Sequence, residues 1–274
     1  MSMGNSKDNL EVGLLTIGNE VLDGVVLDTN SNWLELSVNA LGAEVKRLVS
    51  VRDTLEEIAH GLDFLKNSCD VIITSGGLGP THDDMTLKAI ARHLKRNLVE
   101  DSLAASIVKR QYKMLHEKGI VETPDYTDNR RKMALIPENS EPLDNTVGGA
   151  PGVKIHEQEV TIFCLPGVPR ELKSIFESSL RPWFEKKTHT KYYEKIVEFR
   201  ERDESVFAPY IDRAMKEFPN VYIKSMPKTY GTSKVLRVWI SARGKEFSEL
   251  QSIVEGAIDF LSKDTGLEPS PVDE

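Results

Sequence analysis

The 274-residue sequence has little cysteine, few aromatic residues and no long apolar run. Its two cysteines, Cys69 and Cys164, are far apart and lack the spacing of a metal site or a redox motif. Cys164 lies within an apolar segment, so we interpret it as a core residue rather than a nucleophile. The cysteines therefore give no indication of function.

No apolar run approaches the roughly 20 residues that a membrane-spanning helix needs. The first ten residues are polar, unlike the apolar centre of a signal peptide. The net charge is -8, which argues against a nucleic-acid-binding surface. We therefore expect a cytoplasmic protein whose partners include neither a membrane nor a nucleic acid.

The chain is longer than a typical domain of about 100–200 residues. Its hydrophobic content of 39% is sufficient for a substantial core. We expect a disordered tail over residues 1–10, a main domain over residues 11–187 and a smaller domain over residues 188–268.

The main domain is predicted to be α/β. Short apolar segments at residues 12–17, 45–51 and 70–75 predict buried parallel strands, and helical patterns lie between them. Residues 153–155 and 160–165 predict a hairpin. The alternation favours a doubly wound, mostly parallel sheet, in which ligands bind beyond the carboxyl ends of the strands.

The segment SGGLGPTHDDMT, residues 75–86, is the most informative motif. It follows a predicted strand, and its glycines permit backbone conformations that turn N–H groups toward an anion. A helix is predicted to begin near Thr81, with Asp84 in a capping pattern three residues later. We therefore expect a phosphate-binding loop that includes Ser75, Gly76, Gly77, Gly79 and Thr81.

Carboxylates accompany this loop. Asp83 and Asp84 would repel a phosphate unless a divalent cation lay between them, so a Mn, Mg or Co ion is predicted, with Asp53 as a further ligand. A monovalent cation is a further candidate. A plainer interpretation also stands: Asp83 and Asp84 cap their own helix, and Asp53 caps the helix that carries Leu55.

Further loops at predicted strand ends supply candidate ligand contacts. Arg131 belongs to a short basic run that could clamp phosphates, although such runs more often form a solvated face. The remaining candidate binding residues are Gly18, Asn19, Glu20, Asn30, Asn145, Gly148, Ala150, Pro151, Gly152, Pro166 and Gly167.

Four motifs together resemble the molybdopterin-binding (MoaB/MogA-like) domain family, and most closely its competence-damage-inducible protein A (CinA) branch. They are IGNE with DTN, the segment at residues 75–86, the loop at residues 145–152, and LPGVPRE. Asn19 departs from the family, which usually has Asp there, and this puts a metal role at that position in doubt. The deamidase domain of full-length bacterial members is not part of this sequence.

The resemblance implies that Asp53 and Asp84 are the functional pair and that Arg131 lies beside the ligand. It also implies a metal-dependent hydrolase that cleaves the diphosphate of FAD or ADP-ribose, the activity we expect here. One alternative is a molybdopterin-binding protein or molybdopterin adenylyltransferase, which would join a phosphoanhydride in the same pocket. Another is a non-catalytic protein that binds a nucleotide.

The second domain is predicted to be α+β and, by the resemblance, KH-like. Strands are expected at residues 193–200, 221–225 and 235–242, and helices at residues 204–218 and 247–261. The glycine pair of a nucleic-acid-binding KH loop is missing, because Gly231 stands alone. We therefore expect a dimerisation or lid role and a homodimer. The last residues, Pro269 to Glu274, are expected to be frayed.

Overall fold

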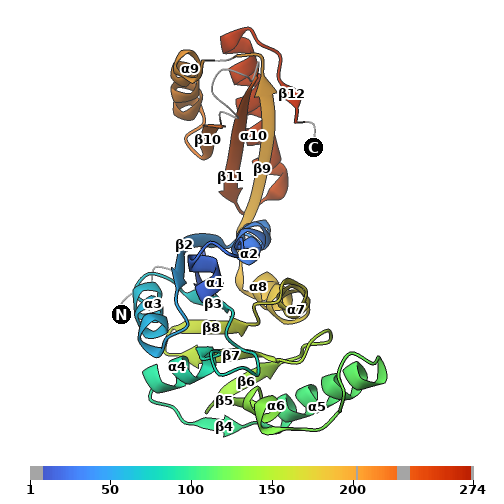
Figure 1. The fold of residues 1–274 in the computed structure, drawn as a ribbon. Helices are drawn as coiled ribbons and strands as arrows, with labels where there is room; N and C mark the ends of the chain where they lie inside the picture. The colour runs from blue at the N-terminus through green and yellow to red at the C-terminus, as the bar shows by residue number, and fades with distance from the viewer. Residues whose placement is uncertain (1–8, 202, 227–234, 273–274) are drawn as a thin grey trace, which may run out of the picture. The chain divides into compact units, whose positions relative to one another are not determined.

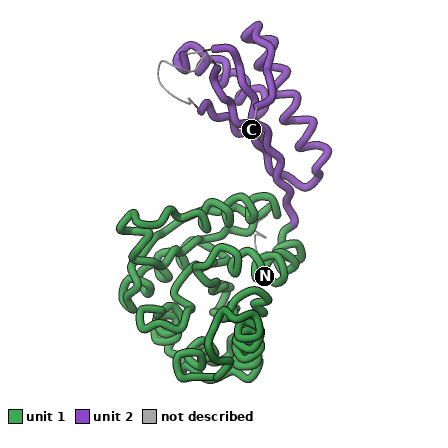
Figure 2. Tube along the Cα trace, turned by 45° about the vertical axis from the view of Figure 1, so that its right-hand side comes forward, with its two compact units in different colours: residues 1–188 green, residues 189–274 purple. Residues whose placement is uncertain are grey.

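The computed structural model describes residues 9–201, 203–226 and 235–272. The chain divides into two compact units, residues 1–188 and residues 189–274 (Figure 2). The predicted tail falls mostly outside the described residues, but Leu10 packs against the core and its carbonyl accepts a hydrogen bond from the Glu44 N–H.

The first unit is built on a six-stranded sheet with the order β2-β1-β3-β8-β7-β6 (Figure 1). The β1–β2, β1–β3 and β3–β8 pairs are parallel, and β7 and β6 extend the sheet in antiparallel fashion. Every residue of β3 and β8 is buried, as expected for central strands covered on both faces. The sheet strands are β1 (Glu11–Ile17), β2 (Glu44–Val51), β3 (Val71–Ser75), β6 (Ser140–Leu143), β7 (Gly152–Glu157) and β8 (Val160–Leu165).

Two apolar cores lie on the opposite faces of this sheet. Leu15 and Ile17 of β1 belong to one core and Val12 and Leu14 to the other, because successive strand side chains point to opposite faces. This arrangement confirms the predicted doubly wound α/β fold. The helices are α1 (Asn19–Leu22), α2 (Thr29–Ala40), α3 (Leu55–Lys66), α4 (Thr86–His93), α5 (Ser102–Glu117), α6 (Asp128–Lys132), α7 (Pro169–Ile175), the π-helix η1 (Phe176–Leu180) and α8 (Arg181–Lys187). Strands β4 (Leu98–Glu100) and β5 (Leu135–Pro137) form a separate antiparallel pair.

Two predicted helix caps are wrong. Helix α4 begins at Thr86 rather than near Thr81, and the Asp84 carboxylate instead accepts a hydrogen bond of 2.8 Å from the Thr81 N–H, closing a turn before the helix. The N-cap of α3 is Thr54, whose hydroxyl accepts from the Glu57 N–H, so Asp53 is not used for capping. Both aspartates are therefore placed by the loops and not by helix termini.

The second unit is a smaller α+β domain, as predicted. Its antiparallel sheet has the order β10-β11-β9-β12 and packs against two helices. The expectation of frayed residues from Pro269 onward is wrong at Ser270 and Pro271, which pair with β9; Gly231 lies outside the described residues. The elements are β9 (Lys191–Phe199), α9 (Glu204–Glu217), β10 (Val221–Met226), β11 (Leu236–Gly244), α10 (Phe247–Thr265) and β12 (Ser270–Pro271).

In the part of the chain that the structure describes, no helix combines the length and the apolar character needed to cross a membrane.

Candidate functional site

A cavity of about 600 Å³ opens at the carboxyl ends of β1, β3 and β8. Its size is typical of a small-molecule site. The loops that follow these strands meet here because parallel strands end at the same edge of the sheet. Most of the predicted site residues line this cavity: Gly18, Glu20, Asn30, Asp53, Ser75, Gly76, Gly77, Gly79, Asp83, Asp84, Ala150, Pro166 and Gly167.

The remaining predicted site residues are not part of the cavity wall: Asn19, Thr81, Arg131, Asn145, Gly148, Pro151 and Gly152. Several of them hold the wall in place. The Asn19 N–H donates to the Asp53 carboxylate over 2.8 Å, and the Thr81 hydroxyl lies 2.5 Å from a carboxylate oxygen of both Asp83 and Asp84. Asn19 and Thr81 therefore position carboxylates of the cavity wall.

Gly76 is the point at which the three strand-end loops meet. Its φ is +106°, and a Cβ at this position would lie 2.1 Å from the carbonyl oxygen of Ile17, at the end of β1. The Cα of Gly76 is also 3.4 Å from the Cβ position of Gly167, in the loop after β8. Only glycine fits such a close approach of backbones.

The predicted phosphate cradle needs one correction at Gly76. Its N–H donates to the Leu165 carbonyl over 3.0 Å, which completes the sheet, so it does not point to a ligand. Gly77 follows with a φ of +68°, and the Thr86 hydroxyl fastens this turn to α4 by donating to the Gly76 carbonyl over 2.8 Å. The backbone after Gly76 is therefore the part of the loop that can bind an anion.

Four carboxylates form an acidic cluster at the cavity: Glu20, Asp53, Asp83 and Asp84. Burial raises the pKa of Asp53, the hydrogen bond from Asn19 opposes this rise, and the negative charges of the other three carboxylates add to it. The four carboxylates come from three loops and line the same cavity, so their negative charges act within one site. The cluster attracts a cation.

The donor set fits a hard divalent cation, because carboxylate oxygens suit Mg²⁺ and Mn²⁺. Among the described residues, no group of three or more His, Cys, Asp or Glu side chains is arranged to hold a metal alone. A Mg²⁺-type ion normally takes one or two carboxylates and completes its shell with phosphates and water. The acidic cluster thus fits a cation that arrives with a phosphorylated ligand.

Lys132, which sequence reasoning did not single out, contributes a positive charge beside the acidic cluster. Its ammonium group donates to the Thr81 carbonyl. Burial lowers the pKa of Lys132, and the charges of Asp84 and Asp83 oppose this change. By contrast, Arg131 donates to Glu100 over 2.7 Å. Lys132, and not the predicted Arg131, therefore supplies positive charge beside the acidic cluster.

A second part of the cavity wall is largely apolar. It comprises Tyr112, Met133, Gly149 and Ala150, with the carboxyl group of Glu171 beside them. Tyr112 lies inside helix α5, where the sequence pattern gave no sign of a ligand contact. The contact is visible only in the structure, where the Tyr112 ring packs against the loop at Gly149. A Cβ on Gly149 would lie 3.0 Å from this ring.

Asn30 adds an oriented polar group. Its Nδ2 donates to the Gly167 carbonyl over 2.8 Å, which fixes the amide. Within the described residues, its Oδ1 is buried without a hydrogen-bond partner, although the residue lines the cavity. A buried acceptor of this kind is costly unless a water or a ligand donor satisfies it.

Comparison with known proteins identifies the family of this chain. Residues 13–186 match the family described as a probable molybdopterin binding domain. A protein of Pyrococcus abyssi is 36% identical over 255 residues, covering 92% of this chain and 96% of its own length. A protein of Thermococcus kodakarensis is 37% identical over 243 residues, covering 88% and 94%.

A solved structure shows the same first unit. The protein CinA from Thermoplasma acidophilum is 31% identical, with a TM-score of 0.58, and the match covers 64% of this chain and 99% of that one. The predicted resemblance is confirmed by these matches and by the shared sheet. The chain belongs to the molybdopterin-binding domain family, and its first unit is CinA-like.

Proposed function

We propose that the cavity binds a phosphorylated pterin or nucleotide and acts on its phosphoanhydride bond with the help of a divalent cation. The observation that carries the proposal is the meeting, in one cavity, of a glycine loop at the strand ends with the acidic cluster. Backbone amides favour a phosphate, whereas carboxylates favour a cation. A cation-bridged diphosphate satisfies both.

Different residues of this chain would bind the cation, orient the phosphate, offset negative charge and exclude water. Asp53, Asp83 and Asp84 are the candidate ligands, of which one or two would hold the cation, and the cation would supply charge neutralisation and polarise phosphorus when bound. The loop after Gly76 orients the phosphate through its backbone. Lys132 offsets negative charge beside Asp83 and Asp84, and the apolar wall around Tyr112 excludes water from the ring of the ligand.

The family membership favours molybdopterin as the ligand, bound or adenylylated. The second candidate is hydrolysis of the diphosphate of FAD or ADP-ribose. It is retained because the matched solved structure is a CinA protein, and resemblance to the CinA branch implies that activity. Both reactions use the same cation-bridged diphosphate, so the acidic cluster serves either.

Product analysis separates the two reactions. The purified protein is incubated with molybdopterin and Mg-ATP, and separately with FAD, ADP-ribose or NADH in Mg²⁺, Mn²⁺ or Co²⁺. Adenylylated pterin with pyrophosphate identifies the transferase, and AMP released from a dinucleotide identifies the hydrolase. If EDTA leaves either activity intact, the role given to the cation is wrong. If no compound binds or reacts, the proposed function fails.

A further inference from the structure

Thr81 brings two carboxylates of the acidic cluster together. Its hydroxyl oxygen lies 2.5 Å from an oxygen of Asp83 and 2.5 Å from an oxygen of Asp84. The Thr81 N–H donates to the same Asp84 oxygen over 2.8 Å. A hydroxyl has one hydrogen, so it can donate to only one of the two carboxylates. The other contact sets oxygen against oxygen, an arrangement that a nearby positive charge stabilises.

Lys132 is joined to the same threonine. Its ammonium group donates to the Thr81 carbonyl, so the polar groups of one residue contact both carboxylates and this cation. The partner in this hydrogen bond is a neutral carbonyl oxygen, which leaves the positive charge uncompensated. An ammonium group has three donors, and the Thr81 carbonyl takes one of them.

The two cations that precede Lys132 in α6 have partners elsewhere. The Arg131 guanidinium donates to Glu100 over 2.7 Å. The Arg130 guanidinium lies over the Tyr112 ring, 3.9 Å from its centroid. Three consecutive basic residues thus contact three different segments, and Lys132 is the one that contacts the loop of the acidic cluster.

The backbone of Lys132 is anchored, whereas its side chain is a flexible four-carbon stem. Thr127 caps α6 by accepting from the Arg130 N–H, and Met133 and Ala134, which follow Lys132, are buried. The ammonium group can therefore leave the Thr81 carbonyl by rotation of its own side chain, with no shift of the helix.

We propose that Lys132 makes divalent-cation binding at the acidic cluster depend on the phosphorylated ligand. In ligand-free protein the ammonium group lies beside the carboxylates, where its charge repels an incoming cation. A bound phosphate adds negative charge that attracts both the ammonium group and the divalent cation, so it overcomes this repulsion. The repulsion itself is independent of the proposed function, and only the effect of the phosphate rests on that function.

The repulsion is large enough to measure. Charges of +1 and +2 that are about 6 Å apart in a water-like medium repel by an amount that changes a dissociation constant roughly 10-fold. Dissolved salt screens interactions between exposed charges, with a Debye length of about 8 Å at physiological ionic strength. The effect of Lys132 on cation binding should therefore be larger at low salt than at high salt.

The first experiment measures the Mn²⁺ dissociation constant of the ligand-free full chain from the electron paramagnetic resonance signal of free Mn²⁺. Lys132→Gln keeps a hydrogen-bond donor and removes the charge. We expect this variant to bind Mn²⁺ about 10-fold more tightly than wild-type protein at low salt, and the gain should shrink at high salt. A merely structural role of Lys132 would not give a gain that depends on salt.

Two further variants locate the effect. Asp84→Asn should weaken Mn²⁺ binding both in the wild-type background and in Lys132→Gln, because it removes a carboxylate of the acidic cluster. The charge-matched control is Lys186→Gln, an exposed residue of α8. It removes the same charge at another place and should leave the Mn²⁺ dissociation constant unchanged.

The second experiment measures ligand dissociation constants by calorimetry, with ATP, FAD and ADP-ribose as probes, each with and without Mn²⁺. In wild-type protein Mn²⁺ should tighten the binding of the probe, and linkage requires the probe to tighten Mn²⁺ binding by the same factor. This coupling factor should be about 10-fold smaller in Lys132→Gln, because the variant no longer repels the cation in the ligand-free state.

Mn²⁺ binding by Lys132→Gln that equals or is weaker than that of wild-type protein overturns the inference. A gain that is the same at low and high salt, or that survives Asp84→Asn in full, also overturns it. The proposed function stands in these cases if Mn²⁺ still tightens the binding of a probe to wild-type protein. Probe binding that ignores Mn²⁺, or no binding of any probe or of molybdopterin, overturns the proposed function, whereas the repulsion measured in the first experiment remains.

Discussion

The carboxylate of Asp53 accepts a hydrogen bond of 2.8 Å from the backbone N–H of Asn19. This bond ties the loop after β2 to the first turn after β1. It explains how a residue that departs from the family pattern still contributes to the site: the backbone of Asn19 holds Asp53, and no carboxylate at position 19 is needed for that contact. Asp53 is thereby held in place by the protein itself.

The variant Asp53→Asn is expected to separate function from stability. Asparagine can still accept from the Asn19 N–H, and it removes a charge that burial and three carboxylates disfavour. The free energy of unfolding at pH 7.5 should not fall. The cation concentration needed for half-maximal ligand binding should rise about 10-fold to 100-fold. Guanidinium denaturation and cation titration measure the two quantities, and unchanged cation dependence would exclude Asp53 as a ligand.

The variant Gly76→Ala should be strongly destabilising. The added Cβ would lie 2.1 Å from the Ile17 carbonyl oxygen, in backbone that cannot easily move, and φ is +106°. We expect a loss of more than about 3 kcal/mol in the free energy of unfolding. Gly119→Ala is the control, since its φ of +69° is similar but nothing lies within 4 Å of the added atom. That variant should lose only about 1–2 kcal/mol.

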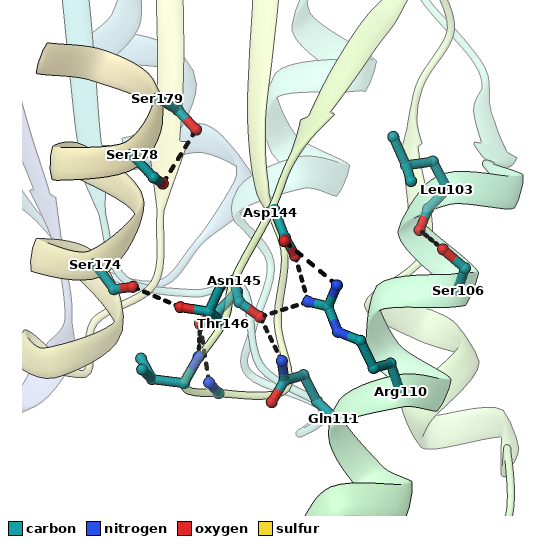
Figure 3. Close-up of polar contacts among 12 residues, drawn as sticks. Leu103, Ser106, Arg110, Gln111, Asp144, Asn145, Thr146, Ser174, Ser178 and Ser179 are labelled. Carbon is teal, nitrogen blue, oxygen red and sulfur yellow. Dashed lines mark hydrogen bonds and ion pairs between the residues drawn. The ribbon is translucent and has the colours of Figure 1, made fainter. Parts of the chain in front are cut away.

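The variant Asn145→Ala should also be destabilising, because it leaves backbone groups of partly buried Val147 and of buried Gly148 and Ala150 without their partner (Figure 3). A loss of about 3 kcal/mol or more is expected. Asn97→Ala removes one exposed side-chain hydrogen bond to Glu138 and should cost less than about 1 kcal/mol. Similar losses in both variants would contradict the organising role of Asn145.

Glu171 should give the protein a specific pH dependence. Its pKa is raised above 4.5 in the folded state, so its contribution to stability is present at low pH and is lost as the pH rises through the raised value. Glu171→Gln lacks this titration. The free energy of unfolding of wild-type protein minus that of Glu171→Gln should therefore be more favourable at pH 4.5 than at pH 7.5. A difference that is flat with pH, or that grows toward neutral pH, would refute the burial of this carboxyl group.

Substitutions of Lys132 and Arg131 should have different effects on ligand affinity, although the two residues are adjacent. The Lys132 ammonium group lies beside Asp83 and Asp84, whereas the Arg131 guanidinium pairs with Glu100 outside the cavity wall. Lys132→Gln should change the affinity for a phosphorylated ligand several-fold. Arg131→Gln should change it less than about 2-fold and cost at most about 1 kcal/mol of stability. A larger effect of Arg131→Gln on affinity would restore its predicted catalytic role.

Much of the site was predictable because it follows from the order of the elements. A buried strand at residues 71–75 followed by glycines can only place those glycines at the edge of a parallel sheet. The turns after Ile17 and Leu165 belong to the same edge for the same reason. The pattern therefore predicted which loops converge.

The roles of individual side chains were harder to predict. Asp53 and Asp84 each had a local explanation as helix caps, and the sequence could not choose between capping and the cavity. The structure decides this because Thr54 caps α3 and Asp84 closes the Thr81 turn. Arg131 and Lys132 are likewise equivalent in sequence, and only the orientation of the short helix α6 distinguishes them.

The sequence by itself determined the fold class, the central parallel strands and the glycine loops, because buried periodicity and backbone conformation are local properties of residues. Tertiary structure alone decided that Tyr112 and Glu171 contact adjacent glycines, and that carboxylates from three loops line one cavity. Distances between residues remote in the chain depend on packing, and packing is set by the whole core rather than by any one segment.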